Sequence, residues 1–377
     1  MRGVWVDAFG EGLRRPTEVD AVIDFAVAAG LDTLVVQATR RGDAFANRLP
    51  LPRADDELAP APFDPLEAVC DRAHAAGLTV HAWLAVTPIA AGTARPERWG
   101  AWLCRRDDGA ERDAHGIWHL DPGHPDARGF VAELAAVVAE AYPVDGVSLD
   151  RVRYPEGGAW GHNPTALRRF QAETGHTAGD APASRWQAWR RAQVTALVDG
   201  VVAAVRATRH DVVVSVNGTC FGGLEAGWEG SRPYLEVAQD WVGWLREQRV
   251  DRVLAMDYRG DTDDVDLVDH GVPPDALAQE GAAAEHAPRE ALRARFEDWA
   301  RLAVSAGGDA AVVGSGLYLQ DVADSADDVA RVAALSVGER RAGGWCGFSY
   351  RTPSRAVLRG RADPSRERDR LAAALGS

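Results

Sequence analysis

Two aspartates in this sequence each end a short apolar run that is typical of a buried strand. Asp150 ends V-D-G-V-S-L-D, and Asp257 ends D-R-V-L-A-M-D. Hydrolysis of a glycosidic bond needs two carboxyl groups, one to protonate the leaving oxygen and one to attack or to activate water. Since the environments of the two groups must differ, we expect Asp150, beside Arg151, to stay ionised. Asp257, beside Tyr258 and an apolar strand, is then the expected acid.

Each of these aspartates also has an interpretation without catalysis. Asp150 is equally typical of a strand-end carboxylate paired with a neighbouring arginine. Side chains alternate along a strand. If Tyr258 points into the site, Asp257 therefore points away from it. Four further carboxylates are held in reserve, each also typical of a loop or a cap: Asp7, Asp43, Glu225 and Glu229.

Polar side chains follow most of the other expected strands. In a parallel α/β barrel these strand ends meet around one rim, where binding and catalytic groups gather. His81 lies within its strand and is also typical of a hydrogen-bonded core histidine. The residues that we predict to bind substrate are Asp7, Gln37, Arg41, Asp43, His81, Trp83, Arg153, Asn217, Tyr258, Tyr318 and Tyr350.

The elements that must position these residues alternate between strand and helix. Junctions such as A-A-G-L-D-T-L-V-V and A-A-G-L-T-V-H-A-W indicate a helix end, a glycine cap and a following strand. Eight such strands predict a single (β/α)₈ barrel. The rival is an open doubly wound sheet, but its G-x-G-x-x-G fingerprint is missing. The strands are expected near 3–9, 32–38, 78–86, 144–150, 211–217, 251–258, 309–318 and 343–350.

Long connections follow strands, whereas connections from helix to strand are short. Loop elaboration on one side of the barrel is typical of a functional rim. No linker rich in proline, glycine or serine divides the chain, so we expect one domain over residues 1–377. Its loop insertions are expected at about 39–63, 87–123, 152–183, 218–234 and 259–287.

Composition narrows the class of ligand. The net charge of −14 over 377 residues argues against nucleic acid and anionic membranes. No histidine or cysteine spacing indicates a metal site, so we expect no metal and no cofactor. The 13 tryptophans can stack on sugars or fill a core. The N-terminus lacks the order of a signal peptide, which favours the cytoplasm unless a leader has been removed. The sequence does not indicate an oligomeric state.

Several motifs, in order along the chain, resemble the glycosyl hydrolase-like 10 family. They are R-G-V-W-V, V-Q-A-T-R-R-G-D-A-F, G-L-T-V-H-A-W-L, L-D-P-G-H-P, V-D-G-V-S-L-D-R-V-R-Y-P, D-W-V-G-W-L and G-F-S-Y. The resemblance implies a TIM barrel with a retaining or inverting glycosidase role on a carbohydrate substrate. Bacterial members are associated with glycan strands, including peptidoglycan, and many are secreted.

The motif around Asp150 departs from the family's usual pattern, in which a second aspartate and a tyrosine follow. Here Arg151 and Val152 stand at those positions. A more distant likeness to barrel α-glycosidases, with aspartates ending strands four and six, implies Asp150 and Asp257. Two alternatives stay open: a carbohydrate-binding barrel without hydrolysis, and a sugar isomerase or lyase.

Overall fold

Eight parallel strands form a closed barrel in the computed structural model, which describes residues 1–257, 289–316, 326–353, 357 and 362–377. The strand order around the barrel is β1-β2-β3-β6-β7-β8-β9-β10, with β10 paired back to β1. The predicted (β/α)₈ fold is therefore confirmed. The strands are β1 (Arg2–Val6), β2 (Thr33–Thr39), β3 (Thr79–Ala85), β6 (Gly146–Asp150), β7 (Val213–Thr219), β8 (Arg252–Met256), β9 (Ala311–Gly316) and β10 (Gly344–Phe348).

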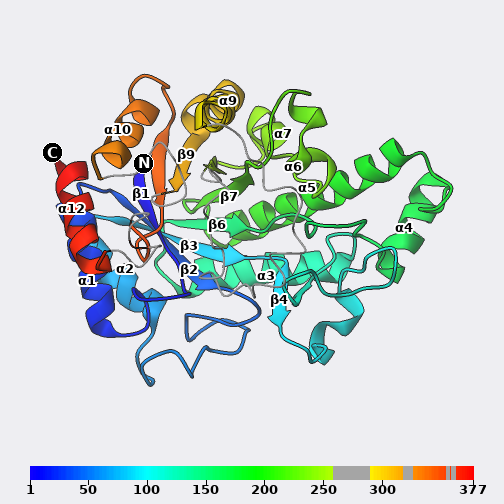
Figure 1. Cartoon of the computed structure of the whole chain (residues 1–377). Helices are drawn as coiled ribbons and strands as arrows, with labels where there is room; N and C mark the ends of the chain where they lie inside the picture. Colours follow the sequence, from blue (N-terminus) through cyan, green and yellow to red (C-terminus); the bar gives the residue numbers. More distant parts are fainter. Residues whose placement is uncertain (258–288, 317–325, 354–356, 358–361) are drawn as a thin grey trace.

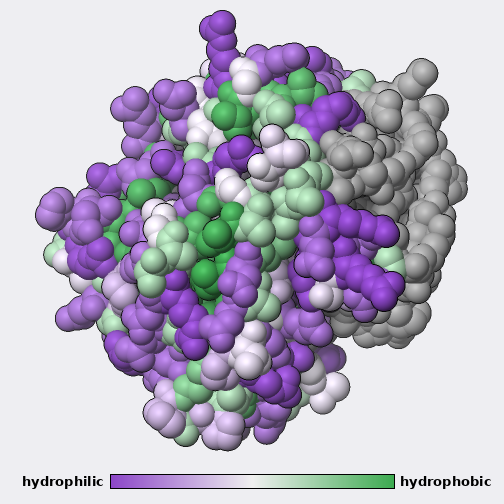
Figure 2. All heavy atoms as spheres, turned by 90° about the vertical axis from the view of Figure 1, so that its left-hand side faces the viewer, coloured by the Kyte–Doolittle hydropathy of each residue, from purple (hydrophilic) through white to green (hydrophobic). Residues whose placement is uncertain are grey.

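Helices surround the strands (Figure 1), and the two ends of the chain lie on the same side of the barrel. There the Arg2 guanidinium donates to the carbonyl of Leu375 over 2.8 Å. The main helices are α1 (Pro16–Ala28), α2 (Pro65–Ala75), α3 (Pro125–Ala141), α4 (Pro164–Thr174), α5 (Ala183–Thr208), α7 (Trp241–Arg246), α9 (Arg289–Gly307), α10 (Ala326–Val337) and α12 (Pro364–Gly376). The face around α1 and α12 is mainly hydrophilic, with apolar side chains in several small patches (Figure 2).

Several helices begin with a proline after a capping side chain. The Asp64 carboxylate accepts a hydrogen bond from the Glu67 amide, as the Asp64-Pro65 pair predicts. Helix α1 begins at Pro16, whose fixed φ suits the first helical position, although Thr17 is the residue type that the sequence offers as a cap. Gly30 and Gly77 follow helices with φ of 59° and 78°, a conformation that glycine adopts without strain.

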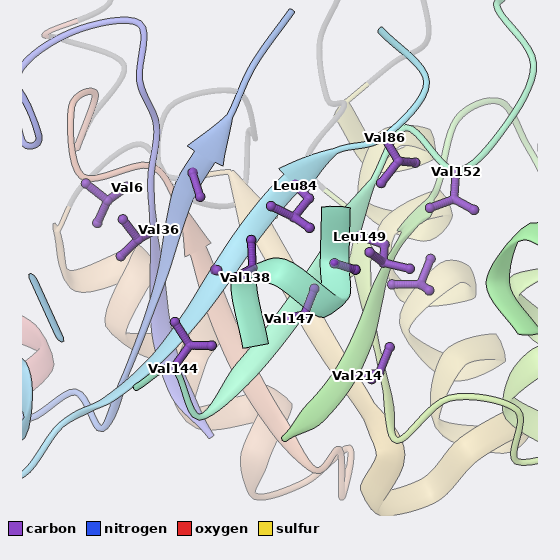
Figure 3. Packing of buried hydrophobic residues seen from close by; sticks show 14 of the residues in the cluster. Val6, Val36, Leu84, Val86, Val138, Val144, Val147, Leu149, Val152 and Val214 are labelled. Carbon is purple, nitrogen blue, oxygen red and sulfur yellow. The ribbon is translucent and has the colours of Figure 1, made fainter. Parts of the chain in front are cut away.

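The outward side chains of the strands pack against the helices. Figure 3 shows Val6, Val36, Leu84 and Leu149 from four neighbouring strands, with Val138 of α3 in the same cluster. All seven residues of β2 are buried, as expected of a parallel strand that is covered on both faces. Within the described chain, no helix combines the length and the apolar character that crossing a bilayer requires.

The barrel interior, here called the lumen, contains a separate apolar cluster. Its members come from alternate positions on the strands: Trp5, Val35, Trp83, Leu254, Val312 and Cys346, with Phe348 packed against them. The Phe348 ring lies edge-on to Trp5 at 6.0 Å and to Trp83 at 6.3 Å between centroids. These residues fix which positions of each strand face inward, and therefore which polar groups reach the C-terminal rim, here called the mouth.

Candidate active site at the barrel mouth

Asp150 is the last residue of β6 and lies in the inward register of that strand. Val147 and Leu149 pack outward into the helix-facing core, which leaves Ser148 and Asp150 for the lumen. The Trp83 indole donates to Oδ2 of Asp150 over 3.1 Å, and the Arg151 amide donates to Oδ1 over 2.8 Å. Asp150 keeps 8% of its surface exposed. It is therefore an oriented carboxylate at the mouth, where the sequence placed it.

Two neutral polar side chains lie in the lumen near this level. The Ser148 hydroxyl donates to the Asn217 amide oxygen over 3.1 Å, which links β6 to β7. Gln37 accepts a hydrogen bond from the Ala8 amide over 2.9 Å. Both Gln37 and Asn217 are buried and inward-facing, as expected for a lining of the lumen. Their roles in binding stay predictions.

Asp7 is the second carboxylate that a described strand segment turns into the lumen, since it continues the register of Trp5. Its Oδ2 accepts from the Ser349 hydroxyl over 2.8 Å. Its Oδ1 accepts from the Arg351 guanidinium and from the Phe9 amide, each over 3.0 Å. The side chain has no exposed surface. Asp7 thus joins the ends of β1 and β10.

Asp257 follows β8 in the opposite register. Leu254 faces the lumen, whereas Val253 and Ala255 pack outward, and Asp257 continues the outward set. Burial raises the pKa of the Asp257 carboxyl well above its usual range, against the opposing charge of Arg340 and with a smaller contribution from Glu297. Glu297 lies on α9, in the helix layer. The structure therefore does not bring Asp257 and Asp150 together as a pair.

His81 also differs from the expectation of a substrate contact. It faces the lumen of the barrel, but it pairs in register with Gly146, the first residue of β6, far from the mouth. An added Cβ on Gly146 would meet the His81 ring at 2.6 Å, so the glycine makes room for the imidazole. Burial lowers the pKa of His81 to about 4, with a further contribution from Arg252. His81 is a neutral core residue in the half of the lumen that lies away from the mouth.

Of the three tyrosines predicted to bind substrate, the structure describes only Tyr350. Tyr350 packs outside the barrel, with its ring 5.4 Å from Phe25 of α1 and 4.7 Å from the Arg368 guanidinium of α12. The non-proline cis bond before Ser349 precedes this change of direction. The other two, Tyr258 and Tyr318, lie outside the described residues.

A hairpin that the sequence did not indicate borders the mouth beside β3. Its strands β4 (Pro88–Ala91) and β5 (Ile117–His119) pair antiparallel. His119 donates from Nε2 to Asp113 over 2.8 Å. Burial acts to raise the pKa of Asp113, but the hydrogen bonds from His119 and the Ile117 amide outweigh it and hold that pKa below its usual value. The hairpin therefore carries a fixed anion close to the strand ends.

The mouth is rich in arginine. Arg40 pairs with Asp43 and Glu57, so the predicted ligand Asp43 is already occupied. Arg153 is buried and pairs with Glu156 over 2.9 Å. Arg41 stacks over the Phe9 ring at 5.1 Å. Arg151, which replaces the second aspartate of the family motif, adopts a left-handed φ of 55°.

Within the described residues, no three histidine, cysteine or acidic side chains gather closely enough to hold a metal ion. The carboxylates at the mouth are instead hydrogen-bonded by amides, an indole, a hydroxyl and arginine. Asp150 and Asp7 therefore offer proton transfer, attack on carbon, or hydrogen bonding to a polar substrate.

Comparison with known proteins agrees with the motifs. A family model described as Glycosyl hydrolase-like 10 matches residues 1–268. The chain belongs to this family. Among curated relatives, glycosyl hydrolase DigH of Escherichia coli O6:H1 is 25% identical over 296 residues, and the match covers 68% of this chain and 65% of DigH. DigH of Escherichia coli K12 gives the same figures. The match thus covers less than two thirds of the length of these curated relatives.

Solved structures of similar fold share little sequence with this family member. The PgaB (BpsB) glycoside hydrolase domain of Bordetella bronchiseptica has a TM-score of 0.64 at 18% identity, and the match covers 98% of each chain. Alpha-L-fucosidase isoenzyme 2 of Paenibacillus thiaminolyticus has a TM-score of 0.60 at 16% identity, covering all of this chain and 48% of the fucosidase. These likenesses show the fold.

Proposed function

We propose that this protein is a glycoside hydrolase whose catalytic site lies at the barrel mouth around Asp150. The observation that carries the proposal is the placement of Asp150, an oriented carboxylate at the C-terminal end of a barrel strand with exposed surface. Catalytic groups of TIM-barrel enzymes lie at this end. Membership of a glycosyl hydrolase-like family supports the same reaction class.

Asp150 is the proposed nucleophile or general base. Its two oxygens each accept one N–H hydrogen bond, which fixes the plane of the carboxylate toward the lumen. Trp83 lies on β3, beside β6, and Arg151 is the residue directly after β6, so both donors are held at the strand ends. A fixed carboxylate loses little entropy when the anomeric carbon or a water molecule arrives beside it.

Asp7 is the proposed second carboxylate, in place of Asp257. Asp7 and Asp150 are the carboxylates that strands turn into the lumen within the described residues, whereas Asp257 faces the helices. The separation of the two carboxyl groups in the substrate complex decides the stereochemistry. Roughly 5–5.5 Å suits retention and about 6.5–9.5 Å suits inversion.

A carbohydrate is the proposed substrate. The similar solved structures carry the names of a fucosidase, a beta-galactosidase and a glycoside hydrolase domain, so the shared fold accommodates several sugars. Amide and hydroxyl groups of Gln37, Ser148 and Asn217 are buried in the lumen near the Trp83 and Phe348 rings, and such polar and aromatic groups are those that bind sugars.

The test is a screen of chromogenic glycosides and bacterial glycans with three proteins. Wild type should release reducing ends, and Asp150→Asn should lower the rate by about a thousandfold or more, the loss typical of a removed catalytic group, while sugar binding is kept. Asp257→Asn is the matched control and should stay active. Binding without any product by wild type would favour the carbohydrate-binding alternative instead. Full activity of Asp150→Asn would refute the assignment.

A further inference from the structure

Two arginines at the mouth, Arg41 and Arg151, differ from their neighbours in having no carboxylate partner among the residues that the structure describes. Arg40, Arg153 and Arg351 are each ion-paired, with distances of 2.5, 2.9 and 3.0 Å to Asp43, Glu156 and Asp7. In the described part of the chain, neither Arg41 nor Arg151 forms an ion pair or a side-chain hydrogen bond. Both side chains are half-buried. In a chain with 56 acidic and 42 basic residues, such an omission at the strand ends points to an external anion.

The two guanidinium groups lie on the same side of the mouth. Arg41 follows β2 by two residues and Arg151 directly follows β6, so β3 alone separates their strands. Burial lowers the pKa of Arg41, and Arg151 is the largest charged contributor to that shift, ahead of Arg40. Arginine remains charged at neutral pH despite such a shift. The fold thus holds two like charges near each other.

The carboxylates in reach of Arg41 are already bound elsewhere. Asp43 accepts from Arg40 and from the Arg41 amide over 3.0 Å. Asp113 accepts from His119 and, through its other oxygen, from the His115 and Ile117 amides, each over 2.9 Å. Both anions moderate the local charge, but neither offers a hydrogen bond to the Arg41 guanidinium. Both carboxylate oxygens of Asp150 likewise accept hydrogen bonds, one from the Trp83 indole and one from the Arg151 amide.

The backbone at Arg151 is held in an unfavourable conformation. Its φ of 55° lies in the left-handed region, which costs energy for a residue with a side chain. Its amide donates to Asp150, and its carbonyl accepts from the Thr87 hydroxyl over 2.8 Å and the Arg153 amide over 2.9 Å. Hydrogen bonds on both sides therefore keep this arginine beside the proposed catalytic carboxylate.

We propose that Arg41 and Arg151 form a subsite for a sugar residue that carries an anionic substituent, a carboxylate or a sulfate, next to the bond at Asp150. The proposal rests on the glycosidase function for the position of that bond. Guanidinium groups bind oxyanions through paired N–H donors. The subsite makes the substrate an acidic glycan. The Arg41 guanidinium lies over the Phe9 ring in a cation–π contact of 5.1 Å.

The test measures the reactivity of individual arginines in the full chain by mass spectrometry after brief treatment with phenylglyoxal. Arg41 and Arg151 should react faster than the paired Arg40, Arg153 and Arg351. Glucuronate or glucose 6-sulfate should slow the modification of both by about tenfold, the change expected from one charge-assisted contact. Glucose at equal ionic strength should not. The comparison of the two anions identifies which substituent the subsite prefers.

Arg112 is the matched control, since it is an exposed arginine between β4 and β5 that lies over the Trp118 ring. The anions should not change its modification rate. Arg41→Gln should abolish the protection of Arg151, whereas Arg112→Gln should preserve it. Equal rates with both anions and with glucose would overturn the proposal. Protection of the two arginines without cleavage of any glycan would support the subsite and refute the hydrolase function. Asp150-dependent cleavage without protection would support the hydrolase function and refute the subsite.

Discussion

The buried His81 should lower the free energy of unfolding of this protein in mild acid. Burial depresses its pKa in the folded chain from 6.5 to about 4. A group with a depressed pKa contributes stability above the unfolded value, and that contribution is lost as the pH falls toward the folded value. One pKa unit corresponds to about 1.4 kcal/mol. The 1.5 units between pH 6.5 and pH 5 therefore correspond to about 2 kcal/mol.

The perturbation is His81→Gln, which removes the titrating group and keeps a polar side chain beside Gly146. Urea unfolding at pH 7 and at pH 5 gives the free energy of unfolding of wild type and variant at both values. Wild type should lose about 2 kcal/mol more than the variant between them, because all other titrating groups cancel in the difference. His210→Gln, at an exposed histidine, is the control and should behave as wild type. An equal loss in wild type and His81→Gln would refute the buried, neutral imidazole.

Two further predictions concern the carboxylates. Trp83→Phe keeps the ring in the lumen but removes the donor to Asp150, so kcat should fall by about tenfold with the free energy of unfolding nearly unchanged; an unchanged kcat would show that the indole N–H does not orient the catalytic carboxylate. Asp257→Asn should keep full activity. Because the pKa of Asp257 is raised in the folded chain, wild type loses the contribution of this group as pH rises, and the variant should gain stability relative to wild type from pH 5 to pH 9 in urea titrations. Loss of turnover in this variant would restore Asp257 as a catalytic candidate.

The alternation of strands and helices could be predicted from the sequence because the junctions between them carry local signals. Gly30 and Gly77 mark helix ends with left-handed φ values, and Asp64 caps the helix that follows it. Such signals depend on a few neighbouring residues. The β4–β5 hairpin has no such signal. Its strands are separated by the long segment from Ala91 to Ile117, and nothing local indicates that they pair.

The direction of a strand-end side chain was predictable only where the two faces of the strand differ in composition. In β6, Gly146 and Ser148 alternate with Val147 and Leu149, which places Asp150 with the small and polar set. In β8 both alternating sets are mainly apolar, since barrel strands are buried on both faces. The sequence therefore indicated the lumen for Asp150 but left the direction of Asp257 open.

Hydrogen-bond partners at the mouth come from distant parts of the chain, which explains why the site was only partly predictable. Asp7 meets Ser349 and Arg351 across almost the whole sequence. The absence of a partner for Arg41 and Arg151 within the described residues is also a property of the folded chain. Residue type alone does not distinguish a paired arginine from one that is available to a ligand.

The most direct test of the account is a crystal structure of the Asp150→Asn protein with a bound oligosaccharide. The account predicts a sugar ring in the lumen mouth, with its glycosidic linkage within about 3.2 Å of the side chain at position 150 and with Asp7 on the same ligand. A sugar bound on another face, or a side chain at position 150 that contacts only Trp83 and the backbone while the ligand lies elsewhere, would contradict it.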